Sequence, residues 1–71
     1  MTTELRNLRA ARGLRQFELA SELDVSEQAI SDWENGKCYP TRKNEAKLFR
    51  YFGISIDRLM QQTDAQDPKS A

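Results

Sequence analysis

The stretch that most constrains this chain is residues 16–36, which read QFELASELDVSEQAISDWENG. Apolar residues recur at helical spacing on both sides of a polar break, which predicts two short helices joined by a tight turn. Asp24 can adopt the left-handed conformation that such a turn needs, and Ser26 is a good N-cap for the second helix. Ala20 supplies the small side chain required where two steeply crossing helices approach each other.

Three further helices are predicted around this pair. Each follows residues that can cap a helix, namely Thr2 or Thr3, Thr41, and Ser55. Apolar residues then follow at helical spacing: Leu5 and Leu8 in the first helix, Leu48, Phe49 and Phe52 in the fourth, and Ile56, Leu59 and Met60 in the fifth. Gly13, Gly36 and Gly53 are placed to end three of the five helices. Because no strand pattern is present, the expected fold is all-α, a compact bundle of five helices.

Composition narrows the class of protein. The chain has 71 residues, one cysteine and no histidine, so it has no internal disulfide and no zinc-finger spacing. Without a nucleophile–base pair or a glycine-rich phosphate loop, we expect no catalytic residue, no metal site, no cofactor and no small-molecule ligand. No apolar run is long enough to span a membrane and the N-terminus lacks a signal-peptide core, so we expect a soluble, cytoplasmic protein. Residues 1–62 form the predicted domain, and the polar residues 63–71 form a predicted disordered tail.

Charged residues fall into three blocks, although the formal net charge is zero. Residues 6–15 hold four arginines and no acid, residues 18–34 hold six acids and no base, and residues 37–50 hold five bases and one acid. A nucleic-acid-binding domain is more often basic overall. Binding to a polyanion would therefore depend on the two basic blocks that flank the acidic one.

The helix caps, apolar positions and glycines together resemble the lambda-repressor-like, Cro-type helix-turn-helix family. The matching residues span about residues 4–60 and are Gln16, Leu19-Ala20, Leu23, Val25-Ser26, Ile30-Ser31, Trp33-Glu34, Gly36-Lys37, Pro40, Gly53, Ile56 and Leu59. The resemblance implies a five-helix domain that binds double-stranded DNA, usually as a homodimer on a two-fold operator. The chain departs from the family pattern at Arg15, Phe17, Asp24 and Glu45.

The resemblance also implies roles for individual side chains. The side chains that it directs toward the DNA bases are those of Ser26, Glu27, Gln28 and Asp32, with Ser31 at the edge of that surface. The residues that it places in contact with the phosphate backbone are Gln16, Asn35 and Lys37. A structural ion pair found in some members corresponds to Arg9 and Glu34. The surface of the fifth helix, which the family often uses for dimerisation, offers Ile56, Arg58, Leu59 and Met60, of which Ile56 and Leu59 also suit the core.

Residue chemistry adds to this assignment. Gln28 is the strongest base-reading candidate, because glutamine can bond bidentately to adenine, which is worth about 1–3 kcal/mol of discrimination. Glu27 and Asp32 would either accept from the amino group of cytosine or repel the phosphates of wrong sequences. Four more phosphate candidates lie in or beside the basic blocks: Arg15, Tyr39, Arg42 and Lys43.

Two functions compete. The first is a sequence-specific transcriptional regulator, and more specifically a repressor, because occupying a promoter is sufficient to block it. The second is a protein-interaction module that keeps the fold with weak or no DNA binding, as the acidic block of residues 18–34 suggests.

Overall fold

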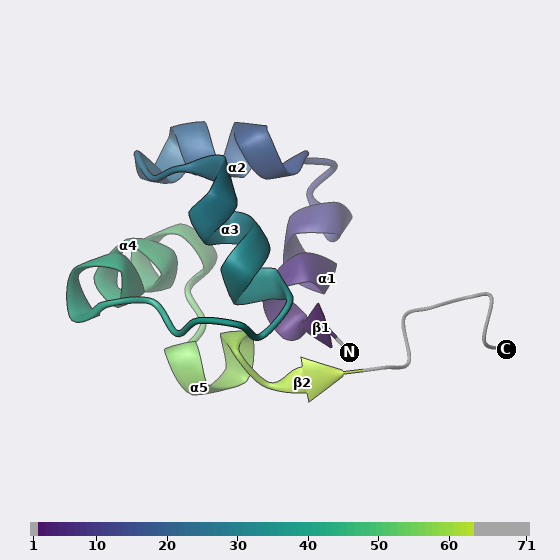
Figure 1. Ribbon diagram of the computed structural model, residues 1–71, viewed down its shortest axis with the longest axis vertical. Helices are drawn as coiled ribbons and strands as arrows, with labels where there is room; N and C mark the ends of the chain where they lie inside the picture. Colours follow the sequence, from purple (N-terminus) through teal and green to yellow (C-terminus); the bar gives the residue numbers. More distant parts are fainter. Residues whose placement is uncertain (1, 64–71) are drawn as a thin grey trace, which may run out of the picture.

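Five helices make up most of the chain in the computed structural model, which describes residues 2–63. They are α1 (Glu4–Ala11), α2 (Gln16–Leu23), α3 (Glu27–Glu34), α4 (Arg42–Phe52) and α5 (Ile56–Leu59). In Figure 1, α3 runs through the middle of the molecule, with α2 across its beginning and with α1 and α4 on opposite sides. The predicted compact bundle of five helices is therefore confirmed. None of these helices is long and apolar enough to cross a membrane.

The ends of α2 and α3 are built on left-handed residues. Asp24 has φ 57° and ψ 48°, and Gly36 has φ 74°. In each turn the next residue donates its N–H to a carbonyl five residues earlier, at 3.0 Å after Asp24 and 2.9 Å after Gly36. This bond belongs to the Schellman motif, which satisfies a carbonyl that a helix end otherwise leaves unpaired. Asp24 thus fills the position where glycine is the usual residue.

Side-chain caps form at two of the predicted positions and not at the others. The hydroxyl of Ser26 accepts the N–H of the residue three positions on at 3.0 Å, and Thr41 does the same at 3.4 Å. Ser55 and Thr3 occupy cap positions but make no such bond. Thr3 is buried, and its hydroxyl donates instead to the carbonyl of Trp33 at 3.1 Å. Both residues thus stand at the predicted N-cap positions, but neither hydroxyl forms the expected side-chain cap, and that of Thr3 is used to bind α3.

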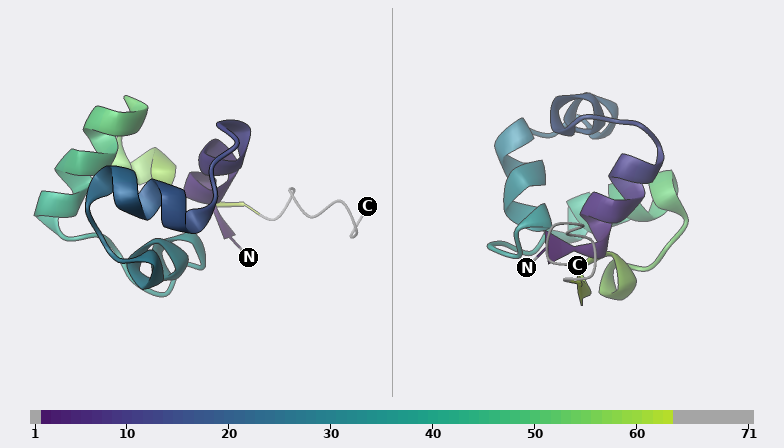
Figure 2. Two further views of the ribbon diagram at one scale, coloured as in Figure 1. Left: turned by 90° about the horizontal axis from the view of Figure 1, so that it is seen from above. Right: turned by 90° about the vertical axis from the view of Figure 1, so that its right-hand side faces the viewer.

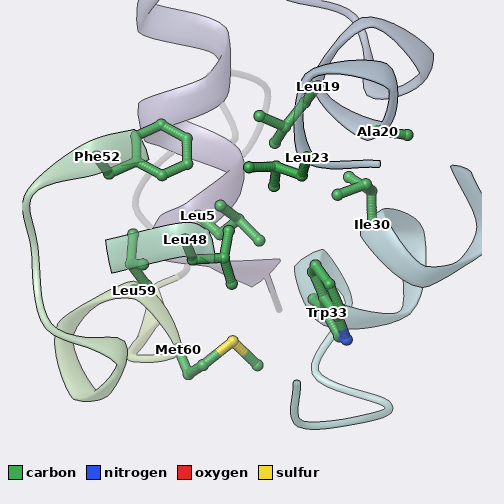
Figure 3. Packing of buried hydrophobic residues seen from close by; sticks show 10 residues of the cluster. All are labelled: Leu5, Leu19, Ala20, Leu23, Ile30, Trp33, Leu48, Phe52, Leu59 and Met60. Carbon is green, nitrogen blue, oxygen red and sulfur yellow. The ribbon is translucent and has the colours of Figure 1, made fainter. Parts of the chain in front are cut away.

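The core gathers apolar side chains from all five helices, as Figure 3 shows. Its members are Leu5, Leu19, Ala20, Leu23, Ile30, Trp33, Leu48, Phe52, Leu59 and Met60. Ala20 is 4% exposed and lies on α2, the helix packed against α3. Trp33 is also 4% exposed, so its indole anchors α3 to the core.

The buried positions of Leu59 and Met60 correct two of the candidates for dimerisation. Leu59 is fully buried and Met60 is 8% exposed, and both point into the core in Figure 3. A side chain already packed in its own core cannot also form a dimer surface without partial unfolding. Of the four candidates, only Ile56, which is half-buried, and Arg58, which is exposed, retain surface on the described domain.

The two ends of the described chain pair with each other, which sequence analysis did not predict. Strands β1 (Thr2–Thr3) and β2 (Gln62–Thr63) form an antiparallel pair, with Thr2 opposite Thr63 and Thr3 opposite Gln62. The expectation of no strand is wrong at these positions, and Thr63 belongs to the folded domain. Two-residue strands are too short to show an alternating pattern. Residues 64–71, the rest of the predicted tail, lie outside the described residues.

Candidate nucleic-acid interface

The recognition candidate α3 has two contrasting sides. Its inner side carries Ile30 and Trp33, which are 0% and 4% exposed. Its outer side carries the base-contact candidates, of which Ser26, Glu27 and Gln28 are exposed and Ser31 and Asp32 are half-buried. Seen from above in Figure 2, α3 forms one edge of the molecule next to α2. A helix that presents polar side chains at a free edge has the shape that a DNA major groove admits.

The outer side chains of α3 bond to one another along the helix. Gln28 donates its Nε2–H to Oδ1 of Asp32 at 3.0 Å, one helical turn later. Asn35 donates through Nδ2 to the hydroxyl of Ser31 at 3.4 Å. Two predicted base readers, Gln28 and Asp32, are thus linked by a hydrogen bond in the free domain. Sequence analysis treated them as independent.

A buried polar network lies at the other end of α3. Glu34 is 2% exposed and forms an ion pair with Arg9, whose side chain is 13% exposed. The guanidinium donates to both carboxylate oxygens, through Nε to Oε2 and through Nη2 to Oε1 at 3.1 Å. Arg9 also donates to the carbonyl of Leu14 at 2.6 Å. This network joins the C-terminal end of α1 and the loop after it to the C-terminal end of α3.

Gln16 extends the network to the first turn of α2. Its Nε2 donates to Oε1 of Glu34 at 3.0 Å, and its side chain is half-buried. A glutamine amide carries two N–H groups, so one N–H donor of Gln16 remains available to a phosphate oxygen. The bond between Gln16 and Glu34 thus links the first turn of α2 to the last turn of α3.

The remaining phosphate candidates lie after α3. Lys37 and Tyr39 are exposed in the loop, and Arg42 and Lys43 are exposed in the first turn of α4. Tyr39 is 58% exposed. Basic side chains thus reach the surface both before α2, at Arg15, and after α3.

The acidic block is less acidic at the surface than its composition suggests. Glu34 is buried and paired with Arg9. Glu18 is half-buried and accepts the backbone N–H of Arg15 at 2.7 Å. On α3 itself, the acids that reach the surface are Glu27 and the half-buried Asp32. The repulsion that α3 would exert on phosphates is therefore smaller than residue counting indicates.

Arg12, one of the four arginines of residues 6–15, packs against aromatic rings. The guanidinium of Arg12 lies 5.0 Å from the ring centroid of Tyr51 and 4.8 Å from that of Phe52. Such cation–π contacts are worth about 0.5–1 kcal/mol at exposed sites. The sequence contained an indication of this packing role, because Arg12 follows Leu8 by four residues and so continues the side of α1 that faces the core.

Comparison with known proteins identifies the family. A family model described as "Helix-turn-helix" matches residues 5–59. The chain belongs to the lambda-repressor-like helix-turn-helix family. Members of this family are DNA-binding transcriptional regulators and not enzymes.

Three relatives are similar to this chain over most of its length. The chain is 40% identical to the HTH-type transcriptional activator BcrR of Enterococcus faecalis over 57 residues, which cover 80% of this chain and 28% of BcrR. It is 37% identical to an uncharacterised HTH-type transcriptional regulator of Methanocaldococcus jannaschii, covering 83% of this chain and 89% of that protein. It is 34% identical to the prophage-derived regulator YonR of Bacillus subtilis, covering 87% and 57% respectively. No solved structure gives a significant match.

Proposed function

We propose that this domain is a sequence-specific transcriptional regulator that inserts α3 into the major groove of operator DNA. The observation that carries the proposal is the two-sided character of α3. Its inner side is fixed by Ile30 and Trp33, while its outer side presents Gln28 at the N-terminal end, just after the Ser26 cap. In helix-turn-helix proteins, it is the N-terminal part of the second helix that contacts base edges.

In this proposal the polar groups divide into readers and anchors. The readers are Ser26, Glu27, Gln28, Ser31 and Asp32, and the anchors are Arg15, Gln16, Asn35, Lys37, Tyr39, Arg42 and Lys43. Phosphate contacts supply affinity and orientation, and base contacts supply specificity. The two kinds of contact therefore respond differently to substitution.

We further propose that the regulator acts as a homodimer, that it represses, and that it works in the cytoplasm. Dimerisation doubles the base contacts that one small α3 can make. Repression needs only occupancy of a promoter, whereas BcrR, one relative, is named as an activator. The exposed free thiol of Cys38 suits a reducing compartment. A reporter driven by the mapped operator distinguishes the two regulatory modes, since loss of a repressor raises transcription and loss of an activator lowers it.

Selection of bound sequences from a random DNA pool tests the reading function. We expect one enriched half-site, repeated with two-fold symmetry. Gln28→Ala should abolish the preference at one base pair, lowering affinity for the selected site by about 10- to 100-fold. Gln61→Ala is the matched control, because that glutamine is exposed and lies outside α3. If Gln28→Ala bound every sequence as the parent does, the assignment of α3 as the reader would be wrong.

Salt dependence tests the anchors. Arg15→Ala and Lys37→Ala should each weaken binding by the same factor for all sequences, and each should reduce the slope of log K against log salt by about 0.9 for every half-site bound. Arg6→Ala is the control, because this exposed arginine lies on the first turn of α1. An unchanged slope in both anchor variants would contradict their phosphate contacts.

A protein-interaction module is the second candidate, and exposed acids favour it. Glu22, Asp24 and Glu27 all reach the surface near the turn between α2 and α3. Such a surface suits a basic partner better than it suits DNA. A gel shift with random duplex at low salt decides between the two functions, because an interaction module would leave the duplex unshifted.

A further inference from the structure

We infer that Asp32 is a positioning residue that restricts Gln28 to adenine, an inference that rests on the proposed DNA-binding function. The observation is the hydrogen bond from Nε2 of Gln28 to Oδ1 of Asp32, at 3.0 Å. Both side chains lie on the outer side of α3, Gln28 exposed and Asp32 half-buried. Asp32 thus acts on a base through Gln28.

The chemistry of the carboxylate fixes the orientation of the amide. An ionised aspartate only accepts hydrogen bonds, whereas a glutamine amide has two N–H donors on one side and a carbonyl on the other. Turning the amide by 180° would place its carbonyl oxygen against the carboxylate, which is repulsive. Asp32 therefore holds the Nε2 side of Gln28 toward itself and leaves the carbonyl Oε1 pointing away.

What remains free on Gln28 is one N–H donor and one carbonyl acceptor. In the major groove adenine presents one acceptor, N7, and one donor, N6–H. The two sets match, so adenine can receive a bidentate contact while the bond to Asp32 is kept. Guanine presents two acceptors, N7 and O6, and a bidentate contact with it would need both N–H groups of Gln28. Because Asp32 already occupies one of them, guanine is disfavoured.

The position of the pair on α3 supports this role. Gln28 is the second residue of α3 and Asp32 lies one turn further on, so the bond runs along the outer side of the helix. Residues four apart on a helix are neighbours, and the bond therefore needs no change of backbone. Glu27 is the other acid of α3 that reaches the surface. In contrast to Asp32, its carboxylate makes no side-chain hydrogen bond within the described residues.

The test compares adenine with guanine at the base pair that Gln28 reads. This base pair is located first, as the one whose preference is lost in Gln28→Ala. For the parent domain we expect adenine to be preferred over guanine there by about 10- to 100-fold. In Asp32→Asn the new amide can turn either its oxygen or its N–H₂ group toward Gln28, so it no longer fixes the orientation of the Gln28 amide and the preference should fall to within about threefold.

Glu27→Gln is the matched control. It removes one negative charge from the same side of α3 without touching the bond between Gln28 and Asp32. Both variants should bind all duplexes more tightly because phosphate repulsion falls, but only Asp32→Asn should lose the adenine preference. A purely structural or electrostatic role of Asp32 would change affinity for both bases by the same factor and would overturn the inference.

A measurement on the free protein gives an independent readout. In nuclear magnetic resonance spectra, the two Nε2 protons of Gln28 should be well separated in the parent and in Glu27→Gln, and they should approach each other in Asp32→Asn. Unchanged Gln28 amide signals in Asp32→Asn would overturn the inference even if DNA binding holds. A parent domain that binds no duplex, with the amide signals responding as expected, would instead refute the proposed function.

Discussion

Two carboxylates of α3 each accept a hydrogen bond from a glutamine amide, but one carboxylate is buried and the other is partly exposed to solvent. Glu34 accepts Nε2–H of Gln16 at 3.0 Å, and Asp32 accepts Nε2–H of Gln28 at the same distance. Glu34 is 2% exposed and also pairs with Arg9, whereas Asp32 is half-buried and has no ion pair within the described residues. The difference in burial gives the two bonds different consequences.

A buried charge has exchanged water for its partners, so the fold depends on those partners. A half-buried carboxylate such as that of Asp32 still reaches water whether or not its neighbour is present, so its bond contributes little to the free energy of unfolding. The buried pair of Glu34 is therefore expected to hold the domain together. The outer side of α3, which carries Gln28 and Asp32, is expected to choose a base.

Neutralising Glu34 should give the largest effect. In Glu34→Gln the buried guanidinium of Arg9 loses its counter-charge, and we expect the free energy of unfolding to fall by about 3–5 kcal/mol. For a domain of this size that is most of the total stability. Urea unfolding followed by circular dichroism measures the change.

The double variant Arg9→Met with Glu34→Leu serves as the control for this experiment. It removes both charges together, and replacing a buried pair by apolar residues is often neutral or stabilising. We expect it to be more stable than Glu34→Gln. A loss below about 1 kcal/mol in Glu34→Gln would show that the pair behaves like a surface salt bridge.

Removing the amide of Gln16 should have an intermediate effect. Gln16→Ala deletes one hydrogen bond to Glu34 but leaves both bonds from Arg9, so we expect a loss of about 1 kcal/mol. The same variant should weaken DNA binding by a similar factor on every sequence, because a phosphate contact carries no sequence information. A sequence-dependent loss would place Gln16 among the base readers.

The features around α3 differ in how far the sequence predicted them. The Ser26 cap and the left-handed Asp24 follow from local rules, because each depends on a few neighbouring residues. The ion pair between Arg9 and Glu34 was implied only by the family resemblance. The bond between Gln16 and Glu34 was not predicted, because it requires the three-dimensional approach of residues that are 18 apart in sequence.

The same limit explains the other unpredicted features. The pairing of Thr2–Thr3 with Gln62–Thr63 joins the two ends of the described chain and leaves no periodic pattern. Met60 reaches the core because α5 is short and the chain turns directly after it. Of the candidate interface, the identity of the outer residues of α3 was readable from spacing. The contacts among those residues were not, because several rotamers satisfy the same spacing.

Replacing Asp24 by glycine should produce a smaller change of opposite sign. Asp24 lies in the turn between α2 and α3 and has a left-handed conformation, with φ 57°, in which a Cβ atom is unfavourable. Asp24→Gly should raise the free energy of unfolding by about 0.5–1 kcal/mol, because the bond from Lys47 to residue 24 uses only the backbone carbonyl. Thermal unfolding checks this, with Asp57→Gly in α5 as a control expected to destabilise. A loss of stability in Asp24→Gly would mean that its side chain contributes more than its backbone conformation costs.

The smallest effect on stability is expected for Asp32→Asn, the counterpart of Glu34→Gln on the same helix. Polar pairs four residues apart on an exposed helix surface contribute about 0.2–0.5 kcal/mol, so unfolding of this variant should nearly superimpose on that of the parent. Its preference between adenine and guanine should nevertheless fall, whereas Glu34→Gln, measured at a temperature where it remains folded, should keep that preference. If Asp32→Asn cost as much stability as Glu34→Gln, the division of α3 into a buried, stabilising side and an outer, reading side would be wrong. If Asp32→Asn kept the stability of the parent but lost its base preference, the bond between Gln28 and Asp32 would be shown to affect DNA binding and not the free energy of unfolding.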